Sequence, residues 1–260
     1  MLTPTEFFIL VPAFLAGLLV LATHVPLGRM VLDRGIVFID LAIAQVAGLG
    51  VVAADGLGWE PNGLSVQASA VSAAMLAAAF LIWTERRLAD VQEAIIGVVF
   101  VVAASAEIIL FSFNPHGAEH LKDLLVGQII WVGTGQLIAA GVVTAAVLAV
   151  VVGFDLGKHR ALFYALFAVS ITVSVQLVGV FLVFASLIIP ALTARGARRP
   201  VLAGYGVGLA GYVLGLLLSA LLDLSTGAAI VCALAATGAV VAVARWRLGL
   251  SVGAIVSAGR

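Results

Sequence analysis

The chain has 260 residues, of which 63% are hydrophobic and only 10% charged, with a formal net charge of zero and a mean hydropathy of +1.25. Soluble domains are about half apolar and a quarter charged, so this composition excludes a soluble globular protein and indicates a polytopic membrane protein. The single cysteine, Cys232, lies in an apolar run and excludes an intrachain disulfide or a thiolate zinc site. No basic region precedes the first apolar run, so we expect that run to stay in the membrane rather than to be cleaved.

Apolar runs of spanning length recur along the chain and predict an all-α fold in a single transmembrane domain, residues 1–260. We expect about eight to nine helices, at residues 6–25, 36–54, 66–84, 92–113, 133–154, 161–176, 177–193, 201–221 and 227–244. The pair between 161 and 193 is short for two full crossings. It therefore predicts a short or broken hairpin, which membranes tolerate where protein buries the irregular backbone.

Basic residues gather beside the ends of alternate apolar runs. They are Arg29, Arg34, Arg86, Arg87, Lys158, Arg160, Arg195, Arg198, Arg199, Arg245, Arg247 and Arg260. Only Lys122 falls on the opposite side. Because Lys and Arg in short loops mark the cytoplasmic face, we expect a multi-pass protein of the inner (cytoplasmic) membrane with its N-terminus outside and its C-terminus in the cytoplasm.

The most informative apolar run extends from Arg34 to Ala54 and holds one carboxylate, Asp40, and one amide, Gln45. An ionisable group inside a span costs roughly 2.5 to 3.5 kcal/mol on insertion scales, so Asp40 is a functional candidate. Gln45 is five residues away and therefore turned by about 140° around a helix. Any metal bound by Asp40 then takes its other ligands from another helix or from water. The alternative is that Asp40 hydrogen-bonds a neighbouring helix or Arg34.

Two further polar side chains lie within or beside spans. Glu107 is about two turns from the outer end of its helix, so it either lines a path or reaches the outer interface. His24 precedes Pro26 and Arg29 near the inner end of the first span, where it is either an interface residue or a path-lining residue. We expect the interface position for both.

The loop from Asn114 to Trp131 is the most polar segment. Asn114 and Pro115 form a good helix start, after which His116, Glu119 and His120 share one face. Two imidazoles and a carboxylate suit a borderline cation such as Zn²⁺. The same letters match the H-x-x-E-H metalloprotease pattern. This segment therefore has three interpretations: a loop that collects cations, a solvated polar helix, or the site of a protease.

Glycines at 204, 206, 208, 211 and 215 are spaced for close helix packing, either within one subunit or at a dimer seam. The short basic turn after residue 190 suits a cytoplasmic partner or anionic lipid. The chain carries no nucleotide-binding glycine loop with its lysine, so any ATP would be hydrolysed by another chain.

Four segments in this order resemble the permease subunit of the ABC-3 family of bacterial zinc/manganese/iron importers, which are ATP-binding-cassette transporters. They are RLADVQEAIIGVVF (87–100), DLLVGQIIWV (123–132), VGVFLVFASLIIPALTAR (178–195) and LLDLSTGAAIV (221–231). The resemblance covers nearly the whole chain. It implies a homodimeric or pseudo-dimeric permease with two cytoplasmic ATPase subunits and an external metal-binding protein.

The resemblance also assigns residues. It places ATPase coupling at Pro190, Ala191, Thr193, Ala194 and Arg195. In family members an aspartate in the second helix is followed four residues later by a histidine, and both belong to the metal path. Here Asp40 has Ala44 at that position, whereas the other register aligns Gln45 with the histidine and Leu41 with the aspartate. The ligand set is therefore incomplete in either register.

Together these observations predict a transport subunit rather than an enzyme, importing a divalent transition metal, zinc before manganese or iron. No covalently bound cofactor is expected, and ATP belongs to the partner. The alternatives are an autonomous proton-coupled carrier using Asp40 and Glu107, and a membrane metalloprotease built on His116, Glu119 and His120.

Overall fold

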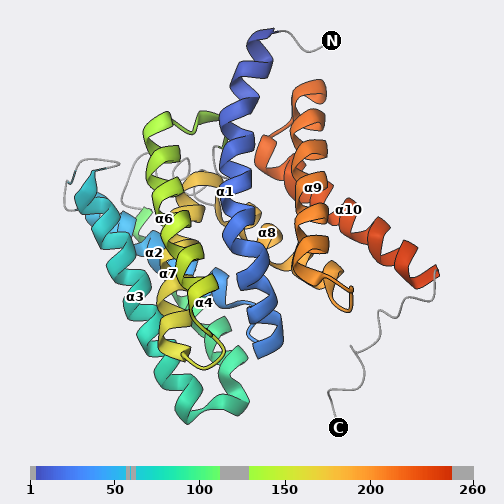
Figure 1. Ribbon diagram of the computed structural model, residues 1–260. Helices are drawn as coiled ribbons and strands as arrows, with labels where there is room; N and C mark the ends of the chain where they lie inside the picture. Colours follow the sequence, from blue (N-terminus) through green and yellow to red (C-terminus); the bar gives the residue numbers. More distant parts are fainter. Residues whose placement is uncertain (1–3, 57–58, 60–62, 112–128, 248–260) are drawn as a thin grey trace.

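The computed structural model describes residues 4–56, 59, 63–111 and 129–247, which are predominantly helical and contain no strand (Figure 1). The elements are α1 (Pro4–Arg34), α2 (Ile39–Gly56), α3 (Leu64–Arg87), η1 (Ala89–Val91), α4 (Gln92–Phe111), η2 (Ile129–Trp131), α6 (Thr134–Gly153), α7 (Arg160–Val178), α8 (Val180–Ala194), α9 (Pro200–Leu222) and α10 (Thr226–Arg247). Among these residues, seven helices are long and apolar enough to cross a membrane, and α2 and α8 are shorter apolar helices. The expected all-α polytopic fold is confirmed.

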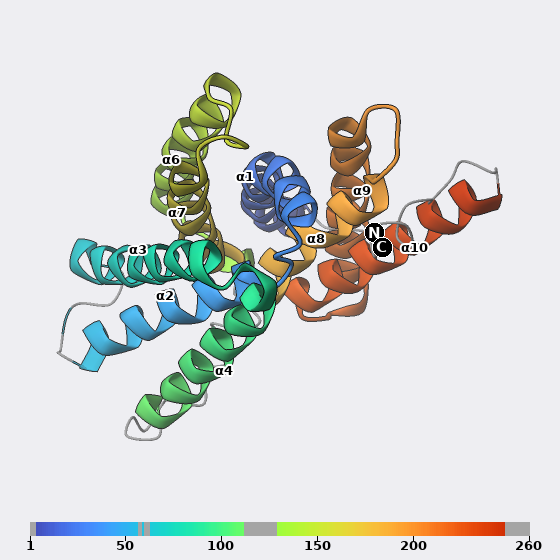
Figure 2. The same cartoon turned by 90° about the horizontal axis from the view of Figure 1, so that it is seen from below.

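The helices form two groups, seen from one end of the bundle in Figure 2. In one group α2 packs on α3 and α4, and α3 also contacts α7. In the other, α9 packs against α10. The short helix α8 contacts α1, α9 and α10, and it also touches α2. Consequently α8 joins the two groups, and most of its side chains are buried.

Helix α1 continues nine residues beyond the predicted end at residue 25, through Pro26 to Arg34. A proline has no backbone N–H, so the carbonyl four residues earlier loses its helical donor. That carbonyl belongs to Ala22, and it accepts a hydrogen bond of 2.8 Å from the hydroxyl of Tyr205 on α9. The tertiary contact therefore satisfies the group that Pro26 leaves free, and the helix passes through the proline.

The break expected between 161 and 193 lies at Gly179, the single residue between α7 and α8. Its φ of 82° and ψ of 161° belong to a backbone region that is accessible essentially only to glycine. The Gly179 N–H still donates to the Val175 carbonyl, and the Gly179 carbonyl accepts from the Val183 N–H. Gly179 therefore hydrogen-bonds to the end of α7 and to the start of α8. Helix α7 is nevertheless long enough for a full span, so within this pair only α8 is short.

Four of the five glycines of α9 pack within the subunit, whereas a Cβ at Gly206 would meet nothing within 4 Å. A Cβ at Gly208 would meet the side chain of Leu21 at 2.6 Å, and one at Gly204 would meet Val25 at 2.9 Å. Both partners lie on α1. Four-residue spacing recurs at Gly211 and Gly215, which instead face α10 at Leu234 and Ile230. Helix α9 therefore approaches two neighbours through two glycine faces, as expected for small residues between membrane helices.

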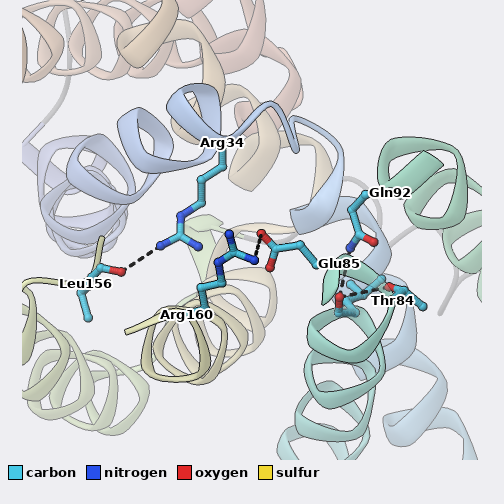
Figure 3. Close-up of polar contacts among 7 residues, drawn as sticks. Arg34, Thr84, Glu85, Gln92, Leu156 and Arg160 are labelled. Carbon is cyan, nitrogen blue, oxygen red and sulfur yellow. Dashed lines mark hydrogen bonds and ion pairs between the residues drawn. The ribbon is translucent and has the colours of Figure 1, made fainter. Parts of the chain in front are cut away.

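A polar cluster ties together the ends of several helices that carry the basic residues (Figure 3). The guanidinium of Arg34 at the end of α1 donates to the carbonyl of Leu156 over 2.8 Å and lies 4.2 Å from the ring centroid of Phe163. Arg160 at the start of α7 pairs with Glu85 near the end of α3, with 3.7 Å between Nη1 and Oε1. We call these residues the Arg34 cluster. It places the basic ends of α1, α3 and α7 side by side.

Candidate functional site

Asp40 lies in the first turn of α2 with its side chain buried, only 1% exposed. Neither carboxylate oxygen has a hydrogen-bond partner of good geometry among the described residues, although the carboxyl group lies near the N–H groups of Asp40 and Leu41. The alternative partner considered above, Arg34, is engaged by Leu156 and Phe163 instead. Asp40 therefore keeps its oxygens available for a ligand, which is unusual for a buried polar group.

A second carboxylate, Glu93 of α4, lies at the same end of α2. Its Oε1 atom accepts a hydrogen bond of 3.2 Å from the Phe38 N–H, and its carboxyl group also lies near the Val37 N–H. These N–H groups precede the first turn of the helix. A carboxylate there is stabilising because it accepts hydrogen bonds from unpaired N–H groups and lies at the positive end of the helix dipole. Glu93 is also close enough to Asp40 for the two acids to interact electrostatically. The start of α2 thus brings two acidic side chains together.

Sequence reasoning did not single out Glu93, because it lies 55 residues from Phe38 along the chain. Gln45, which it did single out, is buried at 3% exposure further along α2. Ala44 occupies the position four residues after Asp40 and is also buried. Within the described part of the chain, no group of three or more His, Cys, Asp or Glu side chains is placed to hold a metal ion.

Glu107 of α4 is buried at 2% exposure, so the expectation that it reaches the outer interface is wrong. Its Oε1 atom lies against Gly48 of α2 in the space that a Cβ would fill, and has no hydrogen-bond partner in the described structure. Gly48 follows Asp40 by eight residues, which is about 12 Å along a helix. Asp40 and Glu107 therefore face the α2–α4 contact at different levels and do not form one joint site.

His24 is completely buried on α1, so the expected interface position is wrong here too. Its Nδ1 atom lies 3.1 Å from the Thr23 hydroxyl, and its Nε2 atom has no partner among the residues described. The extension of α1 beyond Pro26 explains the difference, because it moves the helix end nine residues past the predicted one. His24 consequently lies inside the bundle instead of at its edge.

The histidine-bearing loop residues His116, Glu119 and His120 lie outside the described residues, as does most of the segment 123–132. Their proposed cation-binding role stays a prediction.

The end of α8 divides into buried and accessible residues. Pro190, Ala191 and Ala194 are buried, Thr193 is half-buried, and Arg195 is exposed. The structure thus places only part of the expected coupling sequence on the surface, where a partner could contact it directly.

An accessible groove adjoins this end of α8. It has a volume of about 410 Å³ and runs between α8 and α10, where Leu192, Thr193 and Arg245 contribute to its lining. Arg245 donates to the Thr193 carbonyl over 2.7 Å and holds the two helix ends together. Arg198 and Arg199 are exposed in the adjoining turn to α9. The surface around the groove is therefore both apolar and basic.

The fold and the family comparison agree. The family model described as "ABC 3 transport family" matches residues 6–156 and 147–245, so the chain belongs to the ABC 3 transport family. It is a membrane-embedded transport permease and not itself an enzyme. The metalloprotease alternative does not fit this family.

Two similar proteins cover most of the chain. The high-affinity zinc uptake system membrane protein ZnuB of Haemophilus influenzae is 25% identical over 248 residues, which are 86% of this chain and 93% of that protein. The structure of PsaBC from Streptococcus pneumoniae in complex with Fab shares the fold, with a TM-score of 0.72 and 22% identity. The match covers 91% of this chain and 92% of the compared chain.

Proposed function

We propose that this chain is the permease of an importer for divalent transition metals, zinc ahead of manganese and iron, and that Asp40 lies on the ion path. The observation that carries the proposal is a fully buried carboxylate with no good hydrogen bond in the described structure, within a chain of the ABC 3 transport family. Buried acids in spans characteristically mark ion pathways. The zinc uptake function named for the Haemophilus influenzae relative supports zinc as the first cargo to test.

The proposed assembly contains two copies of this permease, two cytoplasmic ATPase subunits and an extracytoplasmic metal-binding protein. Support for the ATPase contact comes from the exposed basic turn of Arg195, Arg198 and Arg199 beside the α8–α10 groove. The Arg34 cluster gathers basic helix ends at one end of the bundle. This arrangement supports a cytoplasmic position for that end, with the N-terminus outside.

Selection among metals is proposed to be shared between the α2 site and the outer loop. Ala44 replaces an imidazole that the family resemblance places four residues after the aspartate, which leaves oxygen donors from Asp40. Oxygen donors suit harder ions and hold zinc less tightly than imidazole does. Weak binding favours release from a conduit, so zinc preference would then come from His116 and His120 in the outer loop.

The direct test is ATP hydrolysis by the reconstituted complex of permease, ATPase and metal-binding protein, measured with Zn²⁺, Mn²⁺ and Fe²⁺ in turn. We expect stimulation by at least one of these ions, and most by Zn²⁺. No stimulation by any of them would overturn the proposed function. Stimulation by Mn²⁺ or Fe²⁺ alone would overturn the zinc assignment while leaving the divalent-metal permease intact.

A further inference from the structure

One aromatic contact joins the start of α2 to α8. The rings of Phe38 and Phe184 are stacked, with centroids 6.1 Å apart and an angle of 6° between their planes. Phe38 immediately precedes α2, and Phe184 lies in the second turn of α8. An aromatic pair of this kind is worth about 0.5 to 1.5 kcal/mol beyond the area it buries, enough to hold two helix ends in register.

Backbone hydrogen bonds hold Phe38 to the first turn of α2 on one side and to α4 on the other. Its carbonyl accepts the Ala42 N–H over 3.3 Å, and its own N–H donates to Glu93. Asp40 lies two residues further on, within the turn that these hydrogen bonds define. A displacement of the Phe38 ring therefore acts on the turn that carries Asp40.

The other ring belongs to a helix that reaches the accessible basic turn. From Phe184, α8 continues through Pro190, which lies inside the helix, to Ala194, and Arg195 follows at the surface. Its backbone packs closely on α1, because the Leu187 carbonyl occupies the position where Gly28 would carry a Cβ. At Pro190, where the helix lacks one backbone hydrogen bond, the Pro190 carbonyl also packs against Gly204 of α9, so contacts with α1 and α9 restrict bending of α8.

We propose that Phe184 is a positioning residue whose stack on Phe38 transmits movement of α8 to the first turn of α2, and so to Asp40. The proposal rests on the proposed function, in which the end of α8 contacts the ATPase and Asp40 contacts the ion. Neither aromatic ring needs to touch the ion. The Phe38–Phe184 stack determines how many metal ions are transported per ATP hydrolysed.

The first test does not depend on transport. Amide hydrogen exchange of residues 39–42 is measured in the purified permease for wild type, Phe184→Ala, Phe38→Ala and the double variant. Loss of the stack should accelerate exchange about three- to tenfold, the range expected for one aromatic pair. The double variant should resemble either single variant. The matched control is Phe181→Ala, on the same helix, where the ring is 52% exposed.

The second test measures metal ions transported per ATP hydrolysed in proteoliposomes of the complete complex. Phe184→Ala should lower this ratio while ATP hydrolysis persists, Phe184→Tyr should restore it, and Phe181→Ala should leave it unchanged. Unaltered exchange and an unaltered ratio in Phe184→Ala would overturn the proposal, as would equal effects of Phe181→Ala. A wild-type complex without metal transport would overturn the proposed function instead, whereas the exchange result would still report on the Phe38–Phe184 link.

Discussion

The hydroxyl of Tyr205 donates a 2.8 Å hydrogen bond to the carbonyl of Ala22, the acceptor that Pro26 leaves without a helical donor. The bond joins α9 to α1 at the point where the sequence predicts that α1 ends. Tyr205→Phe removes only the donor, and an unpaired carbonyl in an apolar setting costs about 1 to 3 kcal/mol. We expect a loss of stability in that range, measured by thermal or denaturant unfolding of the purified permease in detergent.

A double-mutant cycle separates this cause from general packing. The substitution Pro26→Ala supplies a backbone N–H that can satisfy the Ala22 carbonyl, so Tyr205→Phe should cost much less in that background. An equal cost of Tyr205→Phe in both backgrounds would show that compensation for Pro26 is not the role of Tyr205.

The contact between Glu107 and Gly48 makes a second prediction. A methyl group at residue 48 would occupy the position of the Glu107 carboxylate, the end of a flexible side chain that can shift, so Gly48→Ala should destabilise the protein by about 1 kcal/mol, the low end of the cost of overpacking. Removing the obstacle in Gly48→Ala/Glu107→Ala should recover part of the loss. Unfolding in detergent checks both variants.

The matched control for Gly48→Ala is Gly97→Ala on α4, because a Cβ at Gly97 meets nothing within 4 Å. The helix propensity of alanine predicts no loss there and a gain of up to about 1 kcal/mol. Equal destabilisation at both glycines would contradict the specific role of the Glu107 contact.

The Arg34 cluster predicts a difference between two basic helix ends. Arg34→Ala loses a charged hydrogen bond to Leu156 and the contact with Phe163, so we expect a stability loss of about 1 to 3 kcal/mol. Arg86→Ala, at an exposed position, should change stability by less than about 0.5 kcal/mol. Arg34→Lys keeps the positive charge that sets membrane orientation but loses the guanidinium contacts. A stability loss between those of wild type and Arg34→Ala would therefore show that the guanidinium contacts contribute apart from the charge. Equal unfolding midpoints for all three variants would refute this interpretation.

The outer-loop hypothesis predicts a functional effect without a stability effect. His116→Ala/His120→Ala should weaken cellular zinc uptake at limiting zinc, because imidazole is a preferred zinc ligand, and should matter little when zinc is abundant. Uptake is measured at both zinc levels, with the amount of permease in the membrane as the control. Unchanged uptake at limiting zinc would dispose of the hypothesis.

Hydropathy was sufficient to predict the helical spans, because each must be apolar over a bilayer's thickness. It also singled out Asp40, since a carboxylate is conspicuous in such a run. What it could not predict are contacts between distant segments. Glu93 meets Phe38 across 55 residues, and Tyr205 meets Ala22 across 183.

The same limit explains the two misplaced side chains. His24 and Glu107 were expected at interfaces from their distance to predicted helix ends, yet burial depends on which neighbour covers them. Glu107 is covered because residue 48 is a glycine, a pairing that spacing along one helix does not reveal.

The central claim is that Asp40 contacts the transported ion, and isosteric removal of its charge tests it most directly. Metal-stimulated ATP hydrolysis is measured for the reconstituted complex with wild-type permease, with Asp40→Asn, and with Asp33→Asn as a control at an exposed carboxylate paired with Arg29. We predict that Asp40→Asn raises the zinc concentration for half-maximal stimulation about tenfold or more, the equivalent of at least about 1.4 kcal/mol, while Asp33→Asn matches wild type. A wild-type response from Asp40→Asn would contradict the claim.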